Sequence, residues 1–105
     1  MTAALGQTLT SPQVNSLQSQ VENVLQEDLT DLYKELSVAD RLAFKTKGEE
    51  VAGQVAQIVR AVKIRIQDII ILIKEWLKML PGVKNYFIEQ EAKIKAEKIL
   101  KLKDK

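Results

Sequence analysis

A chain of 105 residues has enough material for one folded domain and too little for a second independent core. Apolar residues make up 46% of the chain and charged residues 29%, a balance that excludes an intrinsically disordered protein. The formal net charge is +2, and the absence of cysteine and histidine excludes disulfides, thiolate metal sites and the usual general base of catalysis near neutral pH. We therefore expect one folded unit without cofactors.

The N-terminal residues come first in chain order. Residues 1–10 are small or polar without a sustained period, and we predict a flexible tail. They lack the basic start and the apolar run of a secretory signal, which predicts a cytoplasmic protein. Ser11 and Pro12 then predict the start of a helix, because a serine oxygen can accept from a free backbone N–H and proline suits the first helical position.

The first predicted helix covers residues 12–36 and is acidic. Apolar residues recur along it at steps of three and four, as on one face of a helix. Residues 1–36 hold five acids and one base, a net charge of −4, whereas residues 37–83 and 84–105 are each net +3. This asymmetry favours docking of the acidic helix against the basic ones.

The second predicted helix, residues 38–80, is the main feature of the sequence. Ser37 and Asp40 have the spacing of a capping box, and a 3.6-residue apolar period follows. Gly48 and Gly53 each weaken a helix by roughly 1 kcal/mol relative to alanine, so a break near residues 46–53 is the alternative to a continuous helix. The apolar stripe holds the predicted interaction residues Val55, Ile58, Val62, Ile66, Ile69, Ile70, Ile73, Trp76 and Leu77.

The third predicted helix covers residues 84–102. Pro81 and Gly82 end the preceding helix, because proline lacks an N–H donor and glycine tolerates a reversal of the chain. The apolar residues of the third helix form two stripes nearly opposite each other, which indicates two packing partners. We also predict an aromatic cluster of Trp76 with Tyr86 and Phe87 across the turn, and a frayed basic end at residues 103–105.

Together these elements predict an all-α fold in a single domain, residues 11–102. One long central amphipathic helix would be flanked by two antiparallel helices, in a bundle or coiled-coil-like arrangement. Such an arrangement is two helices thick and leaves part of the apolar stripe in water, and Ile64 and Ile71 add a second apolar surface. We therefore expect a homo-oligomer or a helical protein partner. The alternative is that these two isoleucines are ordinary single exposed residues.

Motifs for chemistry are not found. No nucleotide-binding glycine motif or zinc spacing occurs, and the serines have no base to activate them. Glu27, Asp31 and Glu35 would share one face of the first helix, an arrangement that can hold a hard cation, although a solvated acidic face is the simpler interpretation. We expect a protein that is not an enzyme and that has no small-molecule substrate.

Basic residues support two alternatives to self-association through the long helix. Lys45, Arg60, Lys63, Lys74 and Lys78 lie near one edge of the apolar stripe, a pattern typical of a helix peripheral to a membrane surface and also of many soluble helices. The lysine-rich C-terminal helix would offer phosphate contacts to a nucleic acid. The low net charge and the lack of aromatic residues between the bases argue against nucleic acid. The basic residues of that helix considered as candidates are Lys95, Lys98 and Lys101.

Overall fold

The computed structural model describes the backbone of residues 12–103 and the side chains of residues 17–102. The all-α prediction is confirmed, since this part of the chain contains helices and no strand. The helices are α2 (Pro12–Gln26), α3 (Thr30–Lys34), α4 (Val38–Arg60), α5 (Ile66–Leu77) and α6 (Asn85–Lys103). The predicted tail, the capping residue Ser11 and residues 104–105 lie outside the described residues.

The predicted three-helix arrangement is wrong, because the described residues form five helices. The first predicted helix ends at Gln26, and a short second helix, α3, follows a turn. The long helix predicted for residues 38–80 ends at Arg60, and α5 begins only at Ile66. Neither break falls at a glycine: α4 continues through Gly48 and Gly53. The third predicted helix is confirmed to within a residue at each end as α6.

Local signals account for where α4 begins and where the chain turns into α6. The Ser37 hydroxyl accepts a hydrogen bond of 3.1 Å from the backbone N–H of Asp40, which confirms the predicted cap. Gly82 has a φ of +73°, in the left-handed region that glycine reaches without a Cβ clash. The turn that contains it lies between α5 and α6.

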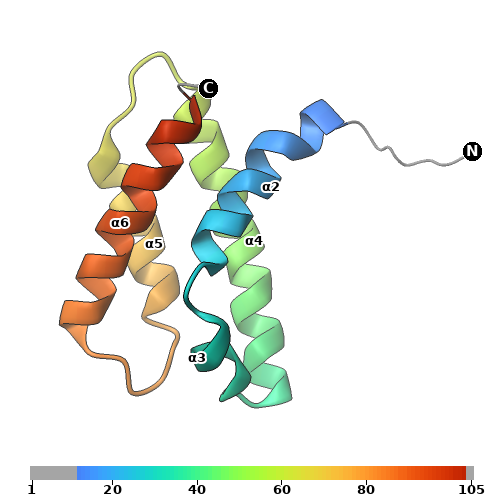
Figure 1. Ribbon diagram of the computed structural model, residues 1–105, viewed down its shortest axis with the longest axis vertical. Helices are drawn as coiled ribbons and strands as arrows, with labels where there is room; N and C mark the ends of the chain where they lie inside the picture. Colours follow the sequence, from blue (N-terminus) through green and yellow to red (C-terminus); the bar gives the residue numbers. More distant parts are fainter. Residues whose placement is uncertain (1–11, 104–105) are drawn as a thin grey trace, which may run out of the picture.

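Four helices enclose one core (Figure 1). Helix α2 packs on α4, α4 on α5, α5 on α6, and α6 on α2, so these helices form a closed ring of neighbours. The two packing partners expected for α6 are thus α5 and α2. The fully buried aliphatic side chains come from all four helices and include Val21, Leu25, Val51, Val55, Val59, Ile69, Ile73, Leu77 and Ile99.

The break between α4 and α5 explains why one chain can cover its own apolar stripe. Backbone at Ala61 (ψ 157°) and Arg65 (ψ 108°) is extended, and α5 folds back to pack on α4. Interrupting a helix loses a few hydrogen bonds worth about 1 kcal/mol each. Complete burial contributes about 1.5–3 kcal/mol for each large aliphatic side chain, and Ile69, Ile73 and Leu77 are all completely buried. Burial therefore outweighs the lost helical bonds.

Candidate functional site

The predicted interaction stripe does not form one surface. Val55, Ile69, Ile73, Trp76 and Leu77 are buried in the bundle, and Ile58, Ile64, Ile66 and Ile70 are half-buried. Val62 in the α4–α5 loop and Ile71 on α5 are exposed. Most of the stripe is thus the core of a single chain, because the break brings α5 back against α4.

The predicted basic residues are also separated by the fold. Lys45, Arg60, Lys63, Lys78, Lys98 and Lys101 are exposed, Lys74 is half-buried and Lys95 is buried. The basic edge expected along one long helix is divided between α4, the loop and α5. Lys95 departs most from expectation, since only 2% of it is exposed.

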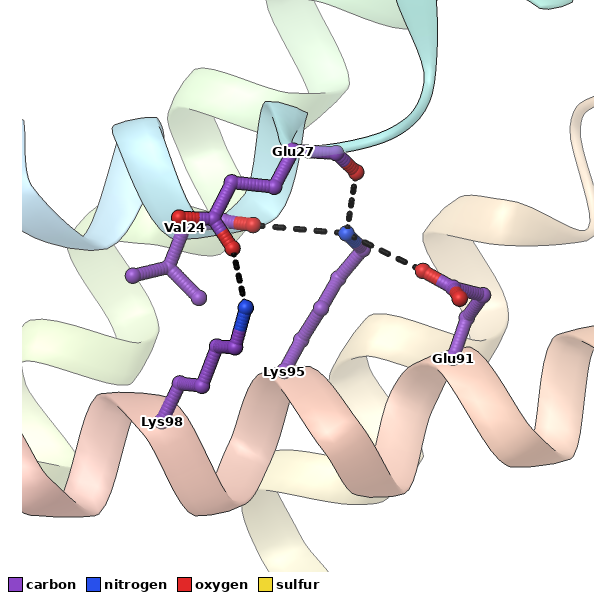
Figure 2. A network of polar contacts seen from close by, with 5 residues as sticks. All are labelled: Val24, Glu27, Glu91, Lys95 and Lys98. Atoms are coloured by element: carbon purple, nitrogen blue, oxygen red, sulfur yellow. Dashed lines mark hydrogen bonds and ion pairs between the residues drawn. The ribbon is translucent and has the colours of Figure 1, made fainter.

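Lys95 of α6 holds the C-terminal end of α2 (Figure 2). Its Nζ donates to the carbonyl oxygens of Val24 (3.3 Å) and Glu27 (2.7 Å) and lies 3.2 Å from a carboxylate oxygen of Glu91. The last carbonyls of a helix lack intrahelical donors and attract positive charge. The lysine therefore supplies a cap from a distant part of the chain. Asp28 follows with a φ of +64° and redirects the chain toward α3.

A second ion pair joins α6 to the turn after α2 at the surface. Nζ of Lys98 lies 2.7 Å from Oε1 of Glu27. The hydrogen bond from Lys98 lowers the pKa of the Glu27 carboxyl below 4.5, and the same bond raises the pKa of Lys98 above 10.5. The acidic first helix thus docks on a basic one, as the charge asymmetry predicts. The predicted line of carboxylates does not form, because Glu27, Asp31 and Glu35 do not share a helix.

The turn at Asp28 leads into a pocket between α2, α3, α4 and the end of α5. Its volume is about 260 Å³, and its apolar lining includes Leu25, Leu29, Tyr33, Phe44 and Trp76. Charged lining residues, Glu22, Lys45 and Glu49, are half-buried or exposed. Sites for drug-sized ligands measure roughly 300–1,000 Å³. The pocket is therefore the size for one or two apolar side chains and too small for a large cofactor.

Trp76 forms the innermost wall of this pocket by packing on α4. Its ring stacks on Phe44 with centroids 4.4 Å apart, and its Nε1 donates to the Phe44 carbonyl oxygen at 2.9 Å. A Cβ on Gly48 would lie 3.0 Å from the indole, so only glycine allows this close approach. The predicted aromatic cluster with Tyr86 is wrong, because Tyr86 is exposed while Trp76 packs against α4. No local pattern signals a pairing between residues so far apart in sequence.

An open face of α4 continues from the pocket mouth. It consists of Val38, Leu42, Lys45 and Glu49, which share one side of the helix because they are spaced four, three and four residues apart. Val38 is 80% exposed and Leu42 is 65% exposed. Sequence reasoning did not select these two residues. The available signal was an apolar pair one helical turn apart, more than a third of a turn on average from the centre of the main stripe.

Known proteins supply no template for this site: no protein-family model, curated protein or solved structure matches the chain. Among the described residues, no group of three or more acidic side chains is placed to hold a metal ion. None of the described helices combines the length and the apolar character that crossing a bilayer requires.

Proposed function

We propose that this chain is a non-catalytic protein that self-associates through the open face of α4 and the pocket beside it. The observation that carries the proposal is the exposure of Val38 and Leu42 on the same face of α4 as Lys45 and Glu49, which line the pocket. Removing apolar surface from water contributes about 25 cal/mol per Å². A second copy that covers both side chains and fills the pocket would gain this energy twice, once on each chain.

The spacing along α4 makes this face complementary to itself. In two antiparallel copies of a helix related by a twofold axis, each step forward along one copy is a step back along the other. The residue numbers of any two residues that face each other therefore add up to the same value. The pair Val38 and Glu49 and the pair Leu42 and Lys45 share the same sum, 87. One axis therefore places both apolar residues of each copy over the pocket mouth of the other, in the isologous contact typical of homodimers. The aliphatic stem of Lys45 can cover the leucine and leave its ammonium in water.

Helix α2 is a precedent within the chain for a helix on this side of α4. It packs along the second half of α4, near Gly53. A Cβ added to Gly53 would lie 3.7 Å from Nε2 of Gln18 on α2. Helix α2 ends at Gln26, and the first half of α4 continues beyond it with Val38 and Leu42 exposed. A helix of a second copy would extend the layer that α2 begins.

The pocket itself supports a binding role over a catalytic one. Its innermost residues are apolar or aromatic, and the charged groups that line it are open to solvent. Glu27, the nearby carboxylate with a lowered pKa, is occupied by Lys98. Catalytic acids and bases are usually found where burial shifts a pKa toward neutrality.

Light scattering after size-exclusion chromatography tests self-association. We expect the solution mass to rise with concentration from 11.9 kDa toward twice that value. Leu42→Lys should hold the protein at the single-chain mass, because it places a charge in the proposed contact. Ile71→Lys is the matched control, since Ile71 is also an exposed apolar residue of a helix but lies on α5. A wild-type mass that stays at 11.9 kDa up to millimolar concentration would overturn the proposal.

Disulfide cross-linking tests the register separately. The chain has no cysteine, so introduced thiols can pair only with each other. A mixture of Val38→Cys and Glu49→Cys proteins should form a cross-linked heterodimer on oxidation, since a disulfide requires Cα atoms within about 7 Å. Either variant alone should not cross-link, because its two copies would be offset by about 16 Å along the helix. Cross-links in either variant alone, or none in the mixture, would contradict this register.

A further inference from the structure

The α4–α5 loop, residues 61–65, lies at one end of the bundle (Figure 1), and together with Arg60 at the end of α4 it is strongly basic. Arg60, Lys63 and Arg65 are all exposed. No acidic residue occurs in the sequence between Glu50 and Asp68. Residues 60–65 therefore carry three positive charges with no acidic residue among them or in the preceding nine residues.

Val62 stands at the centre of this basic loop and is 100% exposed. Two residues further, Ile64 is half-buried and packs against the core. The backbone is extended at both ends of the loop, at Ala61 and Arg65. The loop is thus attached to the bundle through Ile64 and presents Val62 outward between cations, where no intramolecular packing accounts for an apolar side chain.

The C-terminal end of α6 reaches the same end of the bundle (Figure 1) and adds the exposed Lys101. None of Arg60, Lys63, Arg65 and Lys101 forms an ion pair with another described residue. By contrast, Lys95 interacts with the Glu27 carbonyl oxygen and the Glu91 carboxylate, and Lys98 forms an ion pair with the Glu27 carboxylate. Four cations at this end are therefore available to an external anion.

We infer that this end of the bundle docks on the surface of a bilayer that contains anionic lipids. The cations would contact lipid phosphates and carboxylates, and Val62 would enter the boundary between headgroups and acyl chains. Basic residues flanking an apolar group are how peripheral proteins bind such surfaces. A nucleic acid would use the same charges, but it offers no apolar layer for Val62, and the loop has no aromatic side chain to stack on a base.

This surface is distinct from the open face of α4. The open face ends at Glu49, in the first half of the helix, whereas the basic loop follows its C-terminal end at Arg60. Failure of self-association would therefore leave the membrane inference standing, and the reverse also holds.

Cosedimentation with vesicles tests the inference. We expect binding to vesicles of phosphatidylcholine with 40% phosphatidylserine, no binding to phosphatidylcholine alone, and binding that weakens as salt increases. Each basic residue near an anionic surface strengthens binding roughly fivefold, so Arg60→Gln, Lys63→Gln and Arg65→Gln together should weaken it about 100-fold. Val62→Ser should weaken it roughly fivefold, because the valine is then replaced by a polar group.

The matched control removes the same charge from the opposite end of the bundle. Lys34→Gln, Lys78→Gln and Lys84→Gln together alter three exposed lysines near α3 and the α5–α6 turn, and vesicle binding should stay within about threefold of wild type. Fluorescence of the buried Trp76 verifies folding of every variant. An equal loss in the control and in the loop variant would overturn the inference, as would the absence of binding to anionic vesicles.

A local reporter and a nucleic-acid comparison complete the test. Because Trp76 is buried, its emission should stay constant, and a blue shift in Val62→Trp should arise from the introduced residue. We expect that shift with anionic vesicles only. A DNA duplex of about 30 base pairs is the competitor. If DNA binds more tightly than the vesicles and its binding depends on the same three cations, the inferred partner is wrong.

Discussion

Two predicted helices are interrupted, at residues 27–29 and at residues 61–65. The two breaks are alike in lacking a helix-breaking residue, but they differ in their tertiary contacts. The break at residues 27–29 is held by tertiary contacts. Lys95 of α6 donates a hydrogen bond to the Glu27 carbonyl oxygen, and Leu29 is only 3% exposed. The break at residues 61–65 leaves Val62 in water. Neither contains proline or glycine. A helix break can thus be a packed part of the core or a free surface, and only its tertiary contacts distinguish the two.

Truncating the apolar residue in each break should give the largest contrast. Leu29→Ala should lower the free energy of unfolding by about 3 kcal/mol, because it removes buried methyl groups and leaves a cavity beside the pocket. Val62→Ala should change it by less than about 0.5 kcal/mol, since the side chain has no packing to lose. Urea unfolding measures both. A similar loss in the free energy of unfolding at the two positions would show that the two breaks do not differ in packing.

Removing the charge of Lys95 should destabilise the packed break directly. Lys95→Met keeps most of the aliphatic stem, but it removes the ammonium that donates to the Glu27 carbonyl oxygen and pairs with the Glu91 carboxylate. The Val24 carbonyl oxygen keeps its bond from the Glu27 backbone N–H. We expect a loss of about 2–3 kcal/mol in urea unfolding. Lys98→Met is the control and should cost much less, because that lysine lies at the surface. Equal losses would mean that the buried interactions of Lys95 stabilise the fold no more than the surface ion pair of Lys98 does.

The two glycines of α4, where a break was the alternative to a continuous helix and none occurs, should respond with opposite signs. Gly53→Ala should stabilise by up to about 1 kcal/mol, since alanine favours a helix and the added Cβ meets Gln18 at an ordinary 3.7 Å. Gly48→Ala should destabilise by about 1 kcal/mol. The added Cβ would lie 3.0 Å from the Trp76 indole, and this steric clash costs more than the gain in helix propensity. Thermal unfolding compares the pair; stabilisation by both would show that the indole shifts freely.

The surface ion pair should give the smallest effect, visible as a pH dependence. The pKa of the Glu27 carboxyl is below 4.5 in the folded chain, so its pairing with Lys98 stabilises the fold above that pH and is lost as the pH falls through the folded value. The raised pKa of Lys98 sets the upper limit above 10.5. Carboxyl NMR should show the Glu27 pKa rising toward 4.5 in Lys98→Gln, and an unchanged value would contradict the pairing.

The candidate site was only partly predictable from sequence. Lys45 was selected as a basic residue and lies at the pocket mouth, and Trp76 was selected as part of the stripe and lies in the pocket wall. Val38 and Leu42 were not selected, because the main stripe lies on another side of the helix. Their exposure depends on where α2 ends, which is fixed by Lys95 about 70 residues away along the chain.

The sequence by itself determined the features that act within a turn or two of helix. These are the all-α class, the start of α4 at the Ser37 cap, the turn at Gly82 and the extent of α6. The tertiary structure decided where the two longest patterns break, which lysine is buried and why Gly48 is glycine. Caps and periodicity depend on neighbours three or four residues away, whereas these features follow from burial against helices distant in sequence.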